Sequence, residues 1–464
     1  MFLNIKVALI KCGMKREFFE AKHILRLAFP MVTTQLLWMT MPVVDNMVVG
    51  KLGASSLAAM AIATTYYWLL QLLSLGVLSA LNPLVAHAFG ARKTGHMRSL
   101  IHSAMAVAFT LALGMGTLLY WGRPLLEWVG QDPELLIESE KYLRAIVWGV
   151  PFYLIFIVLR QFCDSVEDPK PTICLVFVGA ILNGVLDFGL VFGLWGLPNL
   201  GIAGAGFATA TVQVMLCGGL LVYVSVASRF QNLRLWDQWE VNWIHIKEML
   251  RLGLPSSGSM LAEMAYFSGS TLIMGLLGVT AVASHQIALN VASVTFMIPM
   301  GVSFAVSVRV GGYAGREDWG GVKMTGTLGQ AICLFLGILN ASILLIFAEQ
   351  IVALYSPDAV IRDLSVQLVR IAGVFQIFDG LQVLGIYLLR GIKDTRIPFF
   401  NTLISYSCFG MGLSVWLTFY RNMGPVGFWI GMISALALAA FLHQKRFKKL
   451  ISAQLFLAST ESKQ

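Results

Sequence analysis

Four carboxylates stand in stretches of the sequence where almost every neighbour is apolar: Asp45, Asp187, Glu263 and Asp379. Charged side chains inside membrane-spanning helices are costly, so they are rare and usually functional. Desolvation disfavours the ionised carboxyl group, which regains stability by holding a proton or by binding sodium or an organic ammonium ion. Competition between such cations for one carboxylate is the simplest physical basis for exchanging one cation against another.

The elements that must hold these acids are long apolar helices. The 464 residues are 57% hydrophobic and 12% charged, whereas soluble globular domains are about 25% charged. Apolar runs of about 20 residues, enough for a helix to cross a bilayer, recur along the chain. The sequence predicts an all-α polytopic membrane protein with twelve transmembrane helices, at residues 24–50, 56–87, 97–121, 137–163, 172–193, 201–228, 247–277, 281–309, 321–347, 364–390, 397–420 and 424–444.

The net charge of +9 could indicate nucleic-acid binding, but the basic residues follow the predicted topology instead. Of the 33 lysines and arginines, 26 fall on the side of the N-terminus and 7 on the opposite side. By the positive-inside rule, this asymmetry places both termini in the cytoplasm. The N-terminal segment lacks the apolar core and cleavage site of a secretory signal. We therefore expect a multi-pass protein of the inner (plasma) membrane, surrounded by the lipid bilayer and without a nucleic-acid partner.

The chain repeats itself at an offset of 225 residues. "LRLAFP" at 25–30 returns as "LRLGLP" at 250–255, and "GKLG" at 50–53 returns as "GLLG" at 275–278. Ordered matches at one offset indicate two copies of a unit. Each copy holds six spans, so both keep the same orientation, related by a pseudo-twofold axis along the membrane normal. The predicted parts are an N-terminal cytoplasmic segment (1–23), an N-lobe (24–228), a cytoplasmic linker (229–246), a C-lobe (247–450) and a cytoplasmic tail (451–464).

Helix geometry sorts the four acids by depth. At about 1.5 Å per residue, Glu263 lies about 20 Å along the seventh span and Asp379 about 22 Å along the tenth, both near mid-membrane. Asp45 and Asp187 lie closer to the outer ends of their spans. These depths predict two carboxylate pairs, one in each half. The alternative is structural, because each acid could pair with a nearby arginine or cap an interrupted helix.

Aromatic and amide side chains in the second half could line a cavity for a lipophilic cation. Tyr266, Phe267 and Phe296 could contact cationic groups through their ring faces, although packing is the simpler interpretation of any one of them. Gln286 and Asn290 are four residues apart and share a helical face. These two amides could line the same cavity or form hydrogen bonds to a neighbouring helix.

Several motifs that would indicate other chemistry are absent from the sequence. It contains no GxxxxGK[ST] nucleotide-binding loop, no HExxH pair and no GxSxG elbow. We therefore expect neither ATP hydrolysis by this chain nor enzymatic activity, and no cofactor apart from a coupling ion, H⁺ or Na⁺.

Six segments resemble the multidrug and toxic compound extrusion (MATE) transporters, most of all their NorM-type bacterial members. They are "PVVDNMVVGKLG" (42–53), "NPLVAHAFGAR" (82–92), "LRLGLPSSGSMLAEM" (250–264), "ASHQIALNVASVTFMIPMG" (283–301), "SVRVGGYAG" (307–315) and "FQIFDGLQVLGIYLLRGIKDTR" (375–396). The resemblance implies two six-helix lobes around a central cleft. It also implies export of cationic, lipophilic compounds in antiport with protons or sodium ions by alternating access.

The resemblance further implies roles for the acids of the second half. NorM-type members are similar in having acids where Asp45, Glu263 and Asp379 stand. In those members the last two are associated with the substrate and with the coupling cation, which would be sodium in a sodium-coupled protein. NorM-type members often have a tyrosine four residues before the acid of the tenth span, and Phe375 takes that place here. This departure removes a hydroxyl ligand for sodium and favours protons.

Proton-coupled relatives of the DinF type instead use a set of polar residues in the N-lobe. Asp45, Asn183, Asp187 and Thr209 match that set. The sequence therefore carries both sets, and it leaves open which lobe binds the coupling cation and whether that cation is sodium or a proton.

Two rival functions remain to be weighed. A flippase for lipid-linked saccharides can share this architecture, but it would need a cationic cavity for pyrophosphate where this sequence offers acids. An intramembrane transferase would need clustered acids at a membrane face, such as DDxxD, which the sequence lacks. We expect a monomer whose substrates are small, cationic, drug-like molecules.

Overall fold

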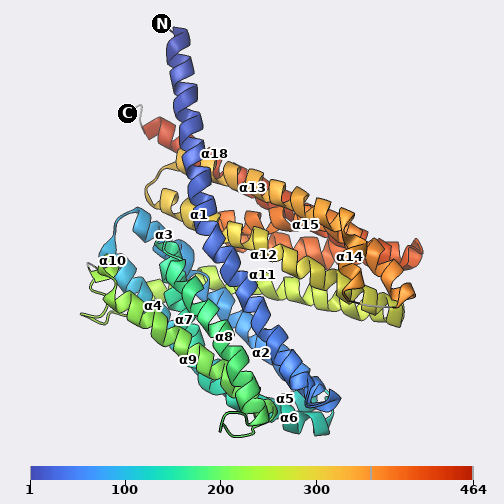
Figure 1. Ribbon diagram of the computed structural model, residues 1–464. Helices are drawn as coiled ribbons and strands as arrows, with labels where there is room; N and C mark the ends of the chain where they lie inside the picture. The colour runs from blue at the N-terminus through green and yellow to red at the C-terminus, as the bar shows by residue number, and fades with distance from the viewer. Residues whose placement is uncertain (1, 232, 356–357, 462–464) are drawn as a thin grey trace. The chain divides into compact units, whose positions relative to one another are not determined.

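The computed structural model describes residues 2–231, 233–355 and 358–461, and within these ranges every regular element is a helix (Figure 1). Residue 1 and residues 462–464, at the ends of the predicted cytoplasmic segments, lie outside the described ranges. Apolar segments form helices in hydrocarbon because every backbone N–H and C=O must then find its partner within the segment.

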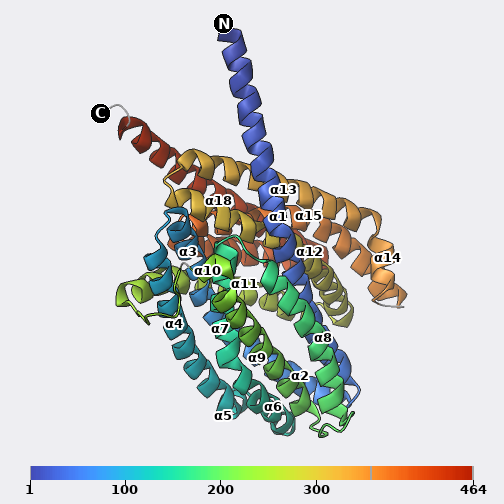
Figure 2. The ribbon, with the colours of Figure 1, turned by 60° about the vertical axis from the view of Figure 1, so that its left-hand side comes forward.

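The first half of the chain begins with one uninterrupted helix, α1 (Phe2–Gly50), which starts well before the span predicted from residue 24. The next helices are α2 (Ala54–Leu78), α3 (Leu81–Gly90), α4 (Thr94–Tyr120), α5 (Gly122–Trp128), α6 (Pro133–Ile146), a 3-10 turn (Val147–Gly149), α7 (Val150–Ser165), α8 (Lys170–Phe192), α9 (Ile202–Val226) and α10 (Ser228–Gln231). Helices α8 and α9 lie side by side in both views (Figures 1 and 2).

The second half repeats this order of long helices. They are α11 (Trp243–Gly275), α12 (Val279–Gly315), α13 (Trp319–Ile346), α14 (Ala348–Ala353), α15 (Ala359–Gly391) and α18 (Gly424–Glu461). The eleventh span is irregular: α16 (Arg396–Leu403), a π-helical turn (Ile404–Gly410), α17 (Met411–Val415) and a second π-helical turn (Trp416–Tyr420).

Among the described residues, 11 helical segments are long and apolar enough to cross a membrane. The one predicted span not among these 11 is the seventh in chain order, which is α11, a helix of 33 residues. Its hydropathy is lower than that of the other spans, because it carries Glu263 and the three serines Ser256, Ser257 and Ser259. The twelve transmembrane helices predicted from the sequence are therefore present, and the protein is a multi-pass membrane protein.

The sequence repeat has a counterpart in the backbone. Eight of the residues with positive φ, each beside the start or the end of a helix, form four pairs at nearly the same offset in the two halves. The pairs are Gly53 (123°) with Gly278 (102°), Arg92 (56°) with Glu317 (60°), Glu167 (61°) with Lys393 (63°), and Gly201 (55°) with Gly424 (57°). The turns between helices thus follow the same plan twice, as expected of a duplicated unit.

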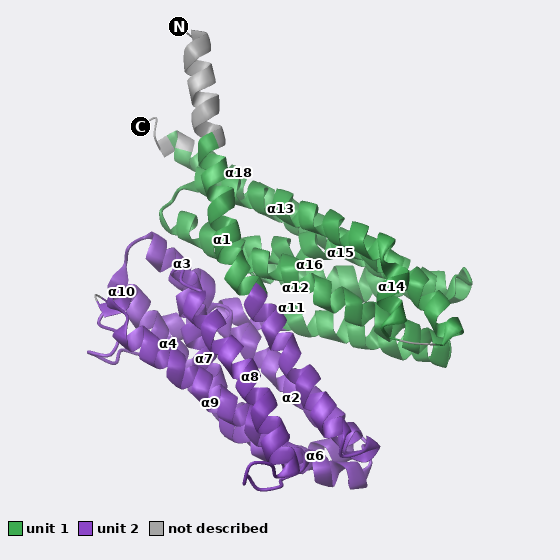
Figure 3. Ribbon diagram, in the orientation of Figure 1, with its two compact units in different colours: residues 1–32, 258–464 green, residues 33–257 purple. Residues whose placement is uncertain are grey.

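The chain forms two compact units, and two helices contribute to both (Figure 3). Unit 1 comprises residues 1–32 and 258–464, and unit 2 comprises residues 33–257. Helix α1 therefore changes unit after residue 32 and α11 after residue 257, which are equivalent positions at the repeat offset of 225. The lobes at 24–228 and 247–450 remain a prediction from the repeat, and the compact units differ from them at these two helices.

Close helix contacts explain why α1 begins in unit 1 and α11 begins in unit 2. In unit 2, Ser257 of α11 donates a hydrogen bond to the carbonyl of Leu73 in α2, at 2.8 Å. In unit 1, Val32 of α1 lies so close to Gly301 of α12 that a Cβ at Gly301 would be 2.5 Å from Val32 Cγ2. Small residues at such crossings let helix backbones approach each other in membranes.

Candidate functional site

Polar side chains from three helices meet inside unit 2. Thr209 of α9 donates a hydrogen bond from Oγ1 to Asp45 Oδ2 of α1, at 3.5 Å. Asn183 and Asp187 of α8 interact with the same carboxyl group. These two residues are four apart, so they lie on one face of α8. The structure thus brings together the four residues that match the N-lobe set.

These acids are buried without an ion-pair partner among the described residues. Asp45 is 5% exposed and Asp187 is fully buried. Within the described ranges, Asp45 Oδ1, both oxygens of Asp187 and both amide atoms of Asn183 lack a hydrogen-bond partner. Buried polar atoms in folded proteins are nearly always satisfied. Two adjacent carboxyl groups with free acceptor oxygens are therefore suited to take up a proton or a small cation.

Tyr142 of α6 is a residue of this site that sequence reasoning missed. Its side chain is 2% exposed and interacts with Thr209 and with both acids. In the sequence it is one tyrosine at the start of an apolar run, and its spacing does not distinguish it from a packing residue. Only the packing of α6 against α9 reveals its role.

The second pair of acids lies in unit 1. Glu263 of α11 and Asp379 of α15 are close enough for their charges to interact. Asp379 is 4% exposed, and its Oδ1 has no hydrogen-bond partner in the described part of the chain. Tyr406, from the first π-helical turn, is fully buried and interacts with both acids. The predicted mid-depth pair is therefore brought together, and Tyr406 is a third member that sequence reasoning missed.

Aromatic rings form a cluster around this second pair. Tyr266 stacks on Tyr406, with ring centroids 5.1 Å apart, and meets Phe267 at 5.9 Å. Phe375, one turn before Asp379, packs edge-to-face between Phe267 at 6.2 Å and Trp429 at 5.5 Å. Two of the predicted cavity residues, Tyr266 and Phe267, therefore belong with Phe375 to one aromatic cluster, whose ring faces can attract a cation.

Gln286, Asn290 and Phe296 are the remaining predicted cavity residues, and all three stand on α12. Gln286 donates a hydrogen bond from Nε2 to Thr271 Oγ1 at 3.0 Å, and Asn290 Oδ1 accepts one from the Tyr355 hydroxyl at 2.9 Å. Both amides are exposed in the isolated chain, and Phe296 is partly buried. The contacts of the two amides are those of the packing alternative, and a role in lining a cavity remains a prediction.

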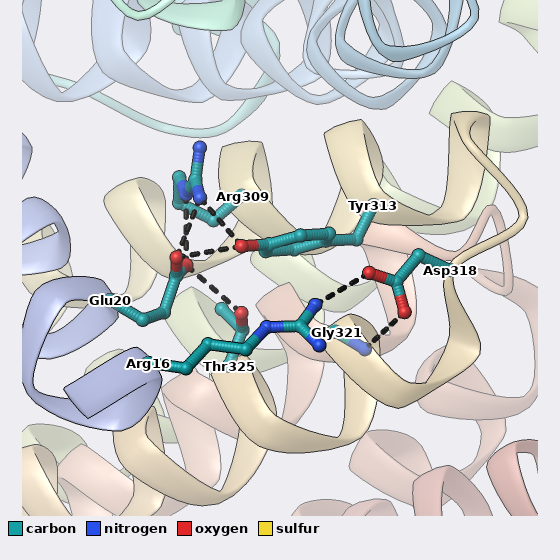
Figure 4. Close-up of polar contacts among 7 residues, drawn as sticks. All are labelled: Arg16, Glu20, Arg309, Tyr313, Asp318, Gly321 and Thr325. Atoms are coloured by element: carbon teal, nitrogen blue, oxygen red, sulfur yellow. Dashed lines mark hydrogen bonds and ion pairs between the residues drawn. The ribbon is translucent and has the colours of Figure 1, made fainter. Parts of the chain in front are cut away.

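Glu20 of α1 shows how this protein satisfies a buried acid that has a structural role (Figure 4). Glu20 is 5% exposed and accepts hydrogen bonds from Arg309 Nε at 2.9 Å and Nη2 at 2.6 Å. The Tyr313 hydroxyl donates a further bond at 2.8 Å and Thr325 Oγ1 another at 3.0 Å. Every acceptor position of this carboxylate is therefore occupied, in contrast to the acids of the two sites.

Comparisons with known proteins cover nearly the whole chain. The MatE family model matches residues 30–188 and 255–416, two segments whose first residues are 225 apart. The chain is 35% identical to the probable multidrug resistance protein NorM of Xylella fastidiosa, over 98% of this chain and 99% of that protein. It is 32% identical to the multidrug resistance protein NorM of Photobacterium profundum, over 92% and 95% of the two chains.

Solved structures share the fold at lower sequence identity. The crystal structure of the eukaryotic MATE transporter AtDTX14 matches with a TM-score of 0.82 and 22% identity, over 95% of this chain and 99% of that one. A crystal structure of MATE in the bent conformation matches with a TM-score of 0.84 and 20% identity, over 95% and 97%. These likenesses support a fold of twelve helices in two lobes.

Proposed function

Because the chain belongs to the multidrug and toxic compound extrusion (MATE) family, whose NorM members it resembles along its full length, we propose how this multidrug efflux transporter is driven. It exports cationic, lipophilic compounds in antiport with protons or sodium ions, by alternating access. The observation that carries the proposal is the contrast among its buried acids. Glu20 is satisfied by four hydrogen bonds, whereas Asp45, Asp187 and Asp379 each have at least one oxygen without a partner among the described residues.

The free oxygens set the exchange chemistry. A buried carboxylate without a partner is costly in a low-dielectric interior, and a proton, a sodium ion or an organic cation can each relieve that cost. Two such cations cannot occupy one carboxylate together, so binding of the coupling ion displaces the substrate. Glu263 and Asp379 supply the negative charge and the cluster around Phe375 supplies ring faces for a cationic substrate.

Protons are the favoured coupling ion. Phe375 offers no oxygen to a sodium ion, and its ring is packed between Phe267 and Trp429. The acids of unit 2 lie beside the hydroxyl group of Thr209 and an amide, and two neighbouring carboxyl groups can share one proton. Sodium at Glu263 and Asp379 is the alternative.

The proposed topology follows from charge. Basic residues concentrate on the side of the N-terminus, so we place both termini in the cytoplasm and the protein in the inner membrane. It would act there as a monomer, with the bilayer and its small-molecule substrates as its partners.

Transport in proteoliposomes tests the proposal. Efflux of a fluorescent cationic dye is measured with a pH gradient and a sodium gradient imposed separately, for the wild type, Asp45→Asn and Asp379→Asn. Loss of one charge–charge interaction of about 1.4 kcal/mol slows transport about tenfold, so each variant should lose at least that much. Matched controls on the same helices are Glu17→Gln in α1 and Asp363→Asn in α15, whose side chains are exposed.

The two gradients separate the coupling ions. Efflux that follows the pH gradient alone supports protons, and efflux that follows the sodium gradient supports the alternative. If Asp45→Asn and Asp379→Asn both transport as fast as the control variants, the assignment of these acids is wrong.

A further inference from the structure

A second group of polar residues extends from Asp379 along the interior of unit 1. Its members are fully buried, and each has at least one side-chain atom without a hydrogen-bond partner among the described residues: Gln382, Thr402, Ser405 and His443. We propose that these four residues, here called the polar track, bind a file of internal water molecules that connects Asp379 with the end of unit 1 where α15 ends and α16 begins.

Three of the four residues fall in two rows, Gln382 on α15 and Thr402 and Ser405 on the eleventh span. On α15, Asp379, Gln382 and Gly385 follow one another at intervals of three, so they share a helical face. On the antiparallel eleventh span, Pro398, Thr402 and Ser405 follow at intervals of four and three, and Tyr406 next to Ser405 interacts with Asp379. The two rows therefore run between the same levels of the unit.

His443 of α18 joins the two rows at their far end. Its Cβ lies 2.6 Å from the position that a Cβ on Gly385 would take, and its Nε2 lies 3.4 Å from the carbonyl oxygen of Pro398. Its Nδ1 has no partner in the described part of the chain. One turn further on α18, Arg446 forms an ion pair with Asp394 at 2.8 Å, with side chains 31% and 16% exposed. The track thus ends close to the surface of the unit.

The other half of the repeat shows that the fold does not require these polar residues. The helix-ending turns at Glu167 and Lys393 match at an offset of 226, and the helix-starting glycines 201 and 424 match at 223. At these offsets, the four track residues correspond to Phe156, Val176, Gly179 and Leu220. The three with side chains are fully buried in the core of unit 2. Unit 2 is therefore apolar at the four positions where unit 1 carries polar side chains.

Water is the ligand that this chemistry selects. Amide, hydroxyl and imidazole groups carry no net charge together, so the track offers no counter-charge for a resident ion. Buried waters typically bind such groups, making two to four hydrogen bonds each. A file of waters could conduct a proton between Asp379 and the surface, and this role rests on the proposed function.

Radiolytic hydroxyl-radical labelling tests the waters directly, because a buried side chain is oxidised rapidly only where water lies against it. The full-length protein in nanodiscs contains its own controls. His102, His285 and His443 are all fully buried, but both ring nitrogens of His102 and of His285 are within hydrogen-bond distance of protein atoms. His443 should be oxidised about tenfold faster than the other two. Equal rates for all three would overturn the proposal.

A variant with apolar residues at three track positions, as unit 2 has at the equivalent positions, tests whether the track residues bind water. In Gln382→Leu/Thr402→Val/Ser405→Ala, oxidation of His443 should fall about fivefold or more, while His102 and His285 keep their rates. An unchanged rate at His443 would show that these residues hold no water. Unchanged rates at His102 and His285 also show that the variant is folded.

Transport then tests the role of the waters. The same variant should slow proton-coupled dye efflux about fivefold or more, while equilibrium binding of the dye is unchanged. If oxidation of His443 slows in the variant and efflux is nevertheless normal, the track is not the path of the coupling ion. Failure of the proposed function itself would appear separately, as normal transport by Asp379→Asn.

Discussion

Replacing Glu20 by alanine removes the carboxylate that faces the Arg309 guanidinium and accepts hydrogen bonds from Tyr313 and Thr325 (Figure 4). The Arg309 and Glu20 side chains are only 11% and 5% exposed, so solvent cannot replace the lost partner fully. Removing one member of a buried, hydrogen-bonded ion pair costs about 3–5 kcal/mol. This loss corresponds to about a hundredfold or more in the folding equilibrium.

Reversible unfolding in mixed micelles, followed by circular dichroism during titration with a denaturing detergent, measures this loss. The matched control is Arg16→Gln, one turn earlier on α1. Arg16 contacts Asp318 at 2.7 Å, but the two side chains are 56% and 37% exposed, and exposed pairs contribute about 0–1 kcal/mol. The double variant Glu20→Gln/Arg309→Gln should lose less than the sum of its two single variants. If Glu20→Ala is no less stable than Arg16→Gln, the argument from burial is refuted.

Two further predictions concern stability. In Gly301→Leu the new side chain must displace Val32, whose Cγ2 and backbone lie 2.5–2.7 Å from the added Cβ. This substitution should lower the free energy of unfolding by about 1–3 kcal/mol. The control in the same helix is Gly312→Ala, which has nothing within 4 Å of its added Cβ and should be nearly neutral. His285→Leu leaves the buried Trp429 indole N–H without the acceptor that it reaches at 3.1 Å, and should cost about 1–3 kcal/mol in the same detergent titration. Wild-type stability of either variant would contradict the contacts described.

The fold could be predicted closely where periodic apolar composition decides it. The fifth span was predicted at 172–193 and α8 runs from Lys170 to Phe192, because length and hydropathy determine a membrane helix. The π-helical turns within the eleventh span were not predicted. Such turns arise from packing against neighbouring helices, as with α18, and leave the composition unchanged. The change of unit within α1 and α11 is likewise a matter of long-range contacts.

Of the residues in the candidate sites, the acids could be predicted from the sequence, but the tyrosines beside them could not. Asp45, Glu263 and Asp379 stand out because ionised groups are rare in apolar runs. Tyr142 and Tyr406 do not, since tyrosine is ordinary in membrane helices, and only the fold shows that they approach the acids. Glu20 lay outside the predicted first span, which began at residue 24, so its buried contacts could not be anticipated.

The division of α1 between the units has a consequence for the order in which the protein can fold. Unit 2 is one continuous segment, residues 33–257, so all of its helices are available before residues 258–464 are synthesised. Unit 1 needs residues 1–32 together with residues 258–464, and Glu20 meets Arg309 across a separation of 289 residues. Domains generally fold as units during synthesis. The N-terminal part of α1 therefore leaves the ribosome before unit 2 does, but it must wait for residues 258–464 before it can pack into unit 1.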